Sequence, residues 1–266
     1  MTHSLKELEP AVIDLTRQAG KAILDVYETA FAVNEKRDNS PVTAADLAAH
    51  DVIYERLSRL TPDWPILSEE GDRILFSERK RWSHYWLIDP LDGTREFVKR
   101  NGEFAVIIAL IEDGRAVLGV VFAPVLDVTY LASSGNGAYK QTATEKHQIR
   151  VRAADLDTLI VAGSRSHSSS RLGRYLQRLG NPNLLSMGSA LKACLVAEGK
   201  ADLYPRFGPT SEWDTAAAQC ILEEAGGRMT DIQMRPLRYN SKASLTNPDF
   251  FAFGDDRYDW SRFLHA

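Results

Sequence analysis

The feature that most constrains the fold is a pair of apolar runs separated by a tight turn. Phe104–Ile111 contains no polar residue, and Ala116–Phe122 follows after Asp113-Gly114. An Asp-Gly pair between two apolar runs is typical of a two-residue β-hairpin turn. Both runs fall well short of the ~18 residues that a membrane-spanning helix needs. The pair therefore predicts an antiparallel hairpin and argues against a membrane span.

Two amphipathic helices are predicted before this hairpin. Apolar residues recur at three- and four-residue steps over 5–26 and again over 47–60, where the pattern includes Leu47. Thr43 and Asp46 have the spacing of a capping box, so the second helix is expected to begin at Thr43. Further strand candidates are Ile66–Leu67, Tyr85–Ile88, Val128–Leu131 and Gly137–Tyr139. The first half is thus expected to be two helices covering an antiparallel sheet.

From about residue 159 the pattern changes to strands alternating with helices. Strands are predicted at 159–162, 184–185 and 201–204, and helices at 171–179, 189–198 and 214–225. Gly226-Gly227 is expected to end the last helix, and short strands and a final amphipathic turn near 260–264 follow it. This alternation indicates an α/β half. The polar stretch 141–152 is the candidate boundary. We therefore divide the chain into an α+β half, residues 1–145, and an α/β half, residues 146–266.

Composition argues against a nucleic acid polymer as partner and favours a reducing compartment. The 266 residues are 44% hydrophobic, and 32 Lys and Arg face 36 Asp and Glu, a net charge of −4 that offers no general attraction to a nucleic acid polymer. Cys194 and Cys220 lie in apolar, helical surroundings typical of buried thiols in a reducing compartment. The N-terminus has neither the basic nor the apolar region of a secretory signal. We expect a cytoplasmic protein.

The strongest local motif is Asp89-Pro90-Leu91-Asp92-Gly93-Thr94, directly after an apolar strand. Two carboxylates at this spacing around a turn can converge on divalent cations, and the Leu91 carbonyl can point the same way. If a helix begins at Gly93, its free amide groups face the same spot and can hold a phosphate. The alternative is a loop in which Asp92 only caps a helix.

Two further acidic segments are ambiguous when each is taken alone. Glu69-Glu70 ends a short strand, and Asp214 follows Trp213 at the start of a predicted helix. A Glu pair is usually solvated, and an Asp at a helix start is usually an N-cap. Clustered carboxylates repel one another unless cations neutralise them, so the set as a whole indicates a metal site.

These segments occur in an order that resembles a known family. The ordered set is similar to the inositol monophosphatase superfamily of magnesium-dependent, lithium-sensitive phosphatases, over nearly the whole chain. The resemblance implies a layered αβαβα sandwich of the sugar-phosphatase type. The segments that carry it are Ser40-Pro41-Val42-Thr43-Ala44-Ala45-Asp46, Ser68-Glu69-Glu70-Gly71, Trp86–Phe97, Trp213-Asp214-Thr215-Ala216-Ala217-Ala218 and Glu224-Ala225-Gly226-Gly227.

Other segments resemble one branch of that superfamily, the CysQ-type 3′(2′),5′-bisphosphate nucleotidases of sulfur assimilation. Inositol monophosphatases typically carry a glutamate shortly before the Trp-Asp motif, where it binds a ring hydroxyl. This chain has residues 206–211 there, and its nearest acid, Glu212, adjoins Trp213. The departure favours a more anionic ligand than inositol. The segments similar to the branch are Gly188-Ser189-Ala190-Leu191-Lys192, residues 199–206 and Ser164-Arg165-Ser166-His167.

The resemblance implies two Mg²⁺ ions per active site, both bound by Asp89. One would be held by Glu69, Asp89 and the Leu91 carbonyl, and the other by Asp89, Asp92 and Asp214. In two-metal sites one ion activates water and the other stabilises the departing oxygen. No covalent enzyme intermediate is expected.

Three residues are expected to act on the attacking water. Glu69 and Thr94 would orient it and accept its proton, and Asp46 would hydrogen-bond the Thr94 hydroxyl. Asp46 is also the capping-box acid of its helix, and the two roles can coexist. A third, weaker metal site at Asp46 is left open.

The implied substrate is 3′-phosphoadenosine 5′-phosphate, hydrolysed to AMP, with the 5′-phosphosulfate as a second candidate. Lys192 and Arg206 would bind the phosphate that is not cleaved, because lysine gives a point charge and arginine a bidentate fork. Ser164–His167 would line the nucleoside side. The scissile phosphate would contact the set Glu69, Leu91, Asp92, Gly93, Thr94 and Asp214.

Three other functions are compatible with parts of the sequence. A haloacid-dehalogenase reaction through an aspartyl phosphate needs two aspartates separated by one residue, whereas two residues separate Asp89 from Asp92. An inositol or sugar monophosphatase on the same fold is the runner-up. A regulator without turnover is disfavoured because the acidic set is complete. The sequence indicates neither an oligomeric state nor an anchor for peripheral membrane association.

Overall fold

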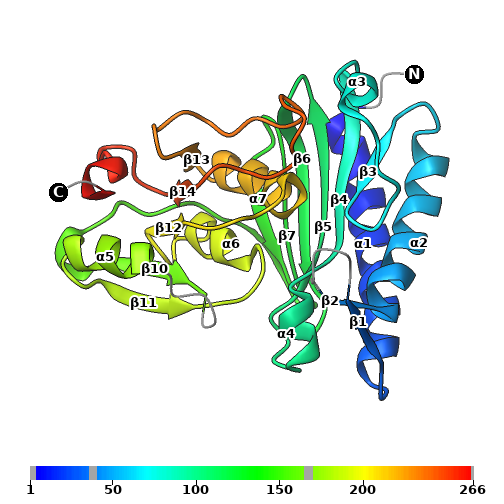
Figure 1. Cartoon of the computed structure of the whole chain (residues 1–266), viewed down its shortest axis with the longest axis horizontal. Helices are drawn as coiled ribbons and strands as arrows, with labels where there is room; N and C mark the ends of the chain where they lie inside the picture. Colours follow the sequence, from blue (N-terminus) through cyan, green and yellow to red (C-terminus); the bar gives the residue numbers. More distant parts are fainter. Residues whose placement is uncertain (1–3, 36–40, 165–169, 265–266) are drawn as a thin grey trace.

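The computed structural model describes residues 4–35, 41–164 and 170–264, which form five layers (Figure 1). Helices α1 and α2 cover one face of a seven-stranded sheet, and α6 and α7 lie between its other face and a five-stranded sheet. Helix α5 and the 3₁₀ turn η2 cover the far face of the second sheet. This confirms the predicted αβαβα sandwich. The helical bounds are α1 (Leu5–Tyr27), α2 (Ala44–Leu60), α5 (Ser170–Arg178), α6 (Leu191–Ala197), α7 (Glu212–Glu224) and η2 (Trp260–Leu264).

The seven-stranded sheet follows the order of the chain, and only its first pair, β3 and β4, is parallel. The hairpin predicted from Asp113-Gly114 joins β5 to β6, with φ of 46° and 74° at the two residues, as a two-residue turn of this kind requires. The strands are β3 (Ile66–Ser68), β4 (His84–Asp92), β5 (Ala105–Glu112), β6 (Arg115–Ala123), β7 (Val128–Ser133), β8 (Ala138–Gln141) and β9 (Lys146–Gln148).

Strand β5 is apolar from Ala105 to Ile111 because helices cover both faces of its sheet. Val106 and Ile108 pack in the cluster beneath α1 and α2, whereas Ile107 and Ala109 pack in the cluster that contains α6 and α7. Helix α7 approaches the sheet closely at Gly119, where a Cβ atom would lie 2.4 Å from the Ala217 carbonyl oxygen. This contact holds α7 on the sheet and so helps to place its first turn.

The five-stranded sheet has the order β11-β10-β12-β14-β13. Strands β11, β10 and β12 are parallel, and β14 runs antiparallel to both of its neighbours. One apolar cluster contains residues of both sheets, and the division of the chain at 145/146 stays a prediction. The strands are β10 (Ile160–Gly163), β11 (Asn183–Ser186), β12 (Leu203–Arg206), β13 (Arg228–Asp231) and β14 (Phe250–Phe253).

Several local expectations need correction. Leu47 was expected on the buried face of α2 but is 52% exposed. Strand β4 continues through Asp92 instead of ending at Ile88, and α7 begins at Glu212, not at Asp214. Helix α6 begins at Leu191, two residues later than expected. Helix α4 (Thr94–Val98) follows Gly93, where the sequence left a helix start open. The elements that the sequence did not indicate are β1 (Val33–Glu35), β2 (Pro41–Thr43), α3 (Phe76–Arg79), β9 and the 3₁₀ turn η1 (Leu156–Thr158).

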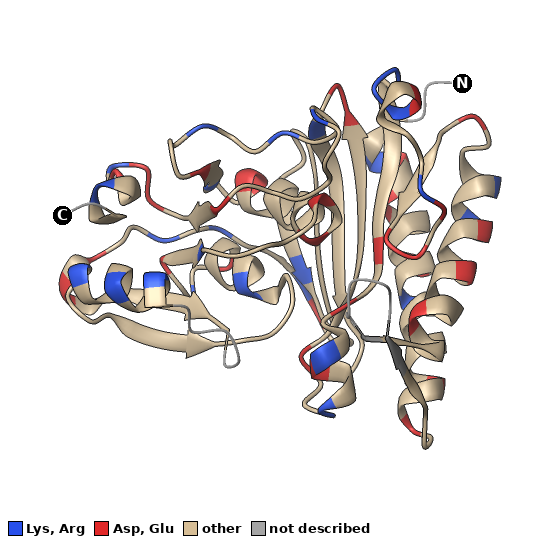
Figure 2. Ribbon diagram, in the orientation of Figure 1, with Lys and Arg blue, Asp and Glu red and all other residues tan. Residues whose placement is uncertain are grey.

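Charged residues of both signs are spread over the elements (Figure 2). The α1 and α2 ribbons carry red and blue bands, whereas α5 carries mainly blue ones, from Arg171, Arg174 and Arg178. Arg171 forms an ion pair with Asp249, so an acid of the same chain compensates one of these positive charges. Within the described ranges, no helix combines the length and apolarity needed to cross a bilayer.

Candidate active site

A bulge at the end of β4 directs two carboxylates into one cleft. Asp89 pairs with Ile107 and Asp92 with Ala105, so β4 has one more residue than β5 between these positions. In a regular strand, residues three apart face opposite sides. The extra residue brings Asp89 and Asp92 to the same side, and Pro90, which has no N–H to donate, is tolerated at a bulge. The sequence motif is therefore a bulged strand end, where a turn directly after the strand was expected.

Three of the predicted metal ligands meet in this cleft. Glu69 follows β3, which is parallel to β4, and Asp214 lies in the first turn of α7. Oxygen atoms of Glu69, Asp89 and Asp214 lie within 4.8 Å of one another, and Asp89 is 2% exposed. The cleft has a volume of about 480 Å³, and its lining also includes Leu91, Asp92, Gly93 and Thr94.

The electrostatics of the cluster fit a divalent metal. Burial raises the pKa of Asp89 well above its usual value, and Glu69, Asp92 and Asp214 raise it further. Burial and Asp92 likewise raise the pKa of Asp214. Among the described residues, no lysine or arginine forms an ion pair with Asp89 or Asp214. Hard cations bound by carboxylate and carbonyl oxygens, such as Mg²⁺, would neutralise this set, so the residues present fit such an ion.

Asp46 joins the cluster through Thr94. The Thr94 hydroxyl donates to Asp46 Oδ1 at 3.2 Å and lies 3.4 Å from the Leu91 carbonyl oxygen. The other oxygen of Asp46, Oδ2, accepts from the Thr43 backbone N–H at 2.7 Å and from the Thr43 hydroxyl at 2.8 Å. One carboxylate thus caps α2 and contacts Thr94 at the same time.

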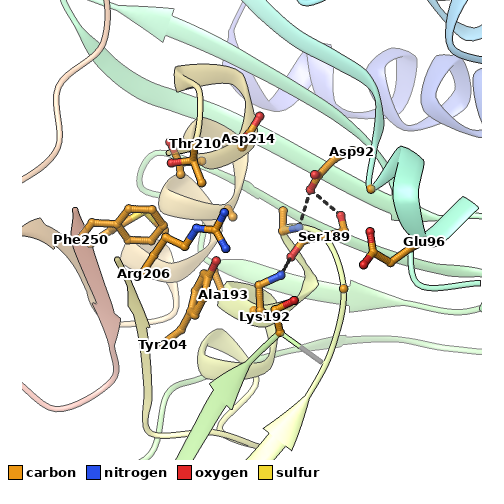
Figure 3. A pocket seen from close by; sticks show the side chains of 17 residues that line it. Asp92, Glu96, Ser189, Lys192, Ala193, Tyr204, Arg206, Thr210, Asp214 and Phe250 are labelled. Atoms are coloured by element: carbon orange, nitrogen blue, oxygen red, sulfur yellow. Dashed lines mark hydrogen bonds between the residues drawn. The ribbon is translucent and has the colours of Figure 1, made fainter. Parts of the chain in front are cut away.

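Asp92 connects the cleft to a second pocket (Figure 3). Its Oδ2 accepts from the Ser189 hydroxyl at 2.6 Å and from the Ala190 backbone N–H at 2.5 Å, just before α6. This oxygen is therefore turned toward α6, and Asp92 is not part of the three-residue cluster described above. The carboxylate nevertheless lines both cavities.

The second pocket, of about 130 Å³, contains the two cations expected there, Lys192 and Arg206. Lys192 is 6% exposed, donates to the Ser189 carbonyl at 2.6 Å and lies 5.3 Å from the centre of the Tyr204 ring. Burial lowers the pKa of Lys192 to about 8. Arg206 donates to the Pro209 carbonyl at 3.1 Å, and its buried Nε has no hydrogen-bond partner in the described part of the chain. Both cations remain available to an anion.

The two cavities adjoin, since they share five lining residues. Ser164 lines the second pocket, as expected, whereas Arg165, Ser166 and His167 lie outside the described residues. The lining residues that were missed as site residues include Glu96, Tyr204, Thr210 and Phe250. Glu96 lies in the same motif as Asp92, and Tyr204 lies in the same motif as Arg206. Nearness in the sequence to these two site residues could therefore have identified them. The shared residues are Asp92, Gly93, Glu96, Thr210 and Asp214.

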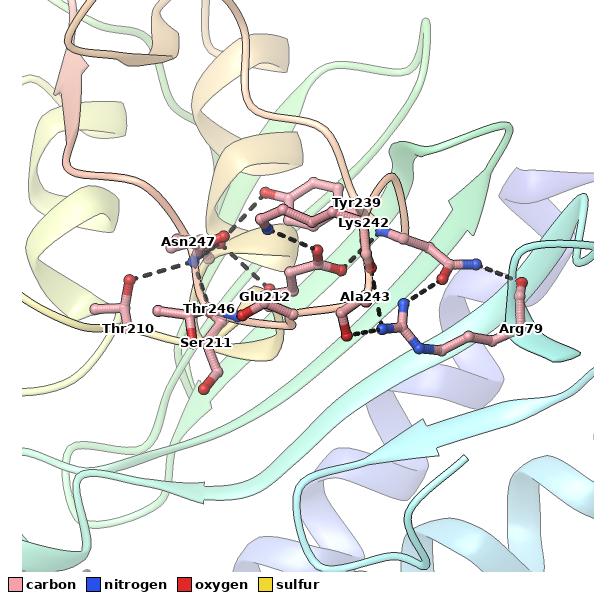
Figure 4. A network of polar contacts seen from close by, with 12 residues as sticks. Arg79, Thr210, Ser211, Glu212, Tyr239, Lys242, Ala243, Thr246 and Asn247 are labelled. Atoms are coloured by element: carbon pink, nitrogen blue, oxygen red, sulfur yellow. Dashed lines mark hydrogen bonds and ion pairs between the residues drawn. The ribbon is translucent and has the colours of Figure 1, made fainter. Parts of the chain in front are cut away.

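Glu212, the acid beside the Trp-Asp motif, points away from both cavities (Figure 4). It is 0% exposed, accepts from the Asn240 backbone N–H at 2.7 Å and lies 3.5 Å from Lys242 Nζ. Burial raises the pKa of Glu212, and its hydrogen bond from Asn240 opposes that shift. Glu212 therefore anchors the segment 239–247 to the start of α7.

Arg79 anchors the same segment from the side of α3. Its guanidinium donates to Asn240 Oδ1 at 2.5 Å and to the carbonyls of Lys242 and Ala243 at 3.0 and 2.6 Å. Thr246, which lines the cleft, lies in this anchored segment. The network thus supports one wall of the cleft from behind.

Comparison with known proteins agrees with this arrangement. The model of the inositol monophosphatase family matches residues 4–252, so the chain belongs to the inositol monophosphatase family, as its motifs predicted. This family is metal-dependent, and the acidic cluster is in place.

Within the family, the chain is similar to proteins named 3′(2′),5′-bisphosphate nucleotidase CysQ. The one from Salmonella typhimurium is 54% identical over 241 residues, which cover 90% of this chain and 96% of the relative. The one from Escherichia coli (strain K12) is 52% identical with the same coverage. The crystal structure of CysQ from Bacteroides thetaiotaomicron matches with a TM-score of 0.82 and 42% identity, covering 92% of this chain and 96% of that one.

Proposed function

We propose that the protein is a Mg²⁺-dependent 3′(2′),5′-bisphosphate nucleotidase that converts 3′-phosphoadenosine 5′-phosphate into AMP and phosphate. The observation that carries this proposal is the pair of cations in the pocket beside the carboxylate cleft. Lys192 and Arg206 have no ion-pair partner there among the described residues, so they are suited to hold a second phosphate. The CysQ relatives bear the name of this activity.

The carboxylate set would hold the metal ions. Glu69, Asp89 and the Leu91 carbonyl would bind one ion, and Asp89, Asp92 and Asp214 the other, which would require Asp92 to release at least part of its contact with Ser189. When bound, the ions supply positive charge to the phosphoryl oxygens and lower the pKa of water. Two Mg²⁺ ions are proposed, and a third at Asp46 stays open.

The chain itself positions the water that attacks phosphorus. The Thr94 hydroxyl donates a hydrogen bond to Asp46, so its oxygen can accept a hydrogen bond from water. The Glu69 carboxylate, which also lines the cleft, accepts the proton that water loses. The backbone N–H groups of Gly93 and Thr94 would bind the phosphate, and Ser164 would contact the nucleoside.

The runner-up, an inositol or sugar monophosphatase, lacks one expected contact. The acid that precedes Trp213 is held in the Arg79 network and lines neither cavity. It therefore has no access to a ring hydroxyl. We also propose that the enzyme works in the cytoplasm, where a nucleotide substrate is available; hydrolysis of the 5′-phosphosulfate would use the same contacts.

Phosphate release over a substrate panel tests the proposal. With Mg²⁺, the purified protein should hydrolyse 3′-phosphoadenosine 5′-phosphate in strong preference to inositol 1-phosphate and sugar phosphates. Lys192→Ala and Arg206→Ala should erode this preference but leave slow monophosphate hydrolysis nearly unchanged, because the metal ligands are untouched. Equal rates for inositol 1-phosphate and the bisphosphate would favour the runner-up. No Mg²⁺-dependent release from any substrate would favour a regulator without turnover.

A further inference from the structure

Glu96 lies where the two cavities meet and has no part in the mechanism above. It belongs to the first turn of α4, directly after the Asp92-Gly93-Thr94 turn, and lines both cavities. The side chain is half-buried. In Figure 3 its carboxylate is on the same side of the pocket as Asp92 and Ser189, opposite Arg206. Glu96 is thus, with Asp92 and Asp214, one of three acids in the lining of a pocket whose Lys192 and Arg206 are suited to anions.

Burial lowers the pKa of Lys192 and the charge of the Glu96 carboxylate opposes that shift, but the carboxylate has no hydrogen-bond or ion-pair partner among the described residues. Asp92, one turn earlier, accepts from Ser189 and Ala190. No hydrogen bond or ion pair links the Glu96 side chain to any of the residues that the structure describes. A partly buried carboxylate with no donor is unfavourable unless water or a ligand supplies one.

Backbone packing keeps Glu96 at this junction. A Cβ atom at Gly188 would lie 2.8 Å from Glu96 Cγ and 2.4 Å from the Glu103 carbonyl oxygen. Glycine at 188 therefore leaves room for the Glu96 side chain against the segment that leads into α6. The next residue in that segment, Ser189, is the one that holds Asp92.

The order of charges along the cavities defines what Glu96 can bind. The carboxylate cleft, with its ions, takes the phosphate that is cleaved, and Lys192 with Arg206 takes the one that is kept. Glu96 lies on the boundary, and an ionised carboxylate only accepts hydrogen bonds, so it repels phosphate oxygens. Between its two phosphates, a nucleoside 3′,5′-bisphosphate offers one free hydroxyl, the ribose 2′-OH next to the scissile ester.

We infer that Glu96 accepts a hydrogen bond from the ribose hydroxyl adjacent to the scissile phosphate and so selects ribonucleotides over 2′-deoxyribonucleotides. This inference rests on the proposed function, whose phosphate contacts set the direction of the ligand. A hydrogen bond to a charged group, once lost, weakens binding by about 10- to 100-fold. The 2′-hydroxyl should therefore contribute a preference of that size.

The test compares 3′-phosphoadenosine 5′-phosphate with its 2′-deoxy analogue. The parent enzyme should show a kcat/KM about 10- to 100-fold higher for the ribonucleotide. Glu96→Ala should bring this ratio close to one, chiefly by lowering the rate on the ribonucleotide. Glu96→Gln, which keeps a neutral acceptor, should give an intermediate ratio. Glu112→Ala, which removes an exposed acid at the end of β5 outside both cavities, should leave the ratio unchanged.

A binding measurement separates recognition from turnover. In the presence of Mg²⁺, calorimetry should show tighter binding of AMP than of 2′-deoxyadenosine 5′-phosphate to the parent, and similar binding of both to Glu96→Ala. An unchanged ratio in Glu96→Ala, or a parent that does not distinguish the two bisphosphates, overturns the inference alone. A parent that hydrolyses neither bisphosphate but releases phosphate from another monoester overturns the proposed function and this inference with it.

Discussion

The Thr94 hydroxyl and Asp46 are joined by a hydrogen bond of 3.2 Å, although 48 residues separate them in the chain. The same aspartate caps α2 through Thr43. Because one carboxylate serves both contacts, the position of Thr94 depends on how α2 begins. The Thr94 oxygen is thereby fixed at the edge of the carboxylate cleft. Its O–H group is engaged in the hydrogen bond to Asp46.

Removal of this hydroxyl should impair the chemical step more than substrate binding. Thr94→Ala is expected to lower kcat by about 100-fold, the lower end of the usual contribution of a positioned proton-transfer partner. KM should change little, because the phosphate contacts remain. Thr94→Ser keeps the hydroxyl and should retain most of the activity. A Thr94→Ala enzyme with near-normal kcat would exclude this residue from the positioning of water.

Asp89 should matter more for activity than Asp46, and less for folding. Asp89→Asn removes the carboxylate proposed to contact both ions, so activity should be nearly lost even at saturating Mg²⁺. In EDTA its thermal midpoint should match or exceed that of the parent, since a buried negative charge surrounded by Glu69, Asp92 and Asp214 is removed. Asp46→Asn should lose less activity but about 1 kcal/mol of stability through the weakened cap. Near-normal turnover of Asp89→Asn would contradict the metal assignment.

Lys192 should make bisphosphate binding sensitive to pH near 8. Its pKa is lowered by burial to about 8, so the free enzyme loses this charge as the pH rises through 8. KM for the bisphosphate should then rise above pH 8, while KM for a monophosphate should not. The folded pKa is below the unfolded value of 10.5, so the free energy of unfolding should increase between pH 8 and 10.5. Both effects should be absent in Lys192→Met, and a KM that is flat to pH 9.5 would show that Lys192 does not bind the second phosphate.

The parts of the fold that are decided by residues close together in the sequence could be predicted from it. The β5–β6 hairpin follows from Asp113-Gly114 between two apolar runs, and the start of α2 follows from the Thr43–Asp46 capping box. The bulge in β4 could not be predicted, because Pro90 and two acids have the composition of a loop. Their place in a strand is decided by pairing with β5. Leu47 has helical periodicity but extends beyond the face of α2 that the sheet covers.

For the candidate site, the proposed metal ligands and the two cations could be named from motifs. The hydrogen bonds that link the site to distant parts of the chain could not be predicted. The hydrogen bond from Ser189 to Asp92 joins residues 97 apart, and that from Arg79 to Asn240 joins residues 161 apart. Nothing in the local sequence indicates which distant acceptor a buried arginine will find. The same limit explains why Glu212 was noted as the nearest acid, while its orientation away from the cavities became clear only in three dimensions.

The Arg79 network should stabilise the cleft wall strongly. Arg79→Met would leave Asn240 Oδ1 and the carbonyls of Lys242 and Ala243 without their donor, at a cost of about 3 kcal/mol or more. Denaturant unfolding measures this loss, and kcat should fall as well because Thr246 in the same segment lines the cleft. Arg59→Met, which removes only an exposed ion pair with Glu55, should cost about 0.5 kcal/mol or less. Equal losses in the two variants would contradict a supporting role for Arg79.

The most direct test of the central claim compares two substrates that differ only in the phosphate that is kept. Adenosine 3′-phosphate presents the same scissile bond as 3′-phosphoadenosine 5′-phosphate but has no group for Lys192 and Arg206 to bind. Two charge-assisted contacts of roughly 1.5–3 kcal/mol each predict a kcat/KM about 100- to 10,000-fold higher for the bisphosphate. Equal kcat/KM values for the two nucleotides would show that the cationic pocket does not recognise a second phosphate, and would contradict the account.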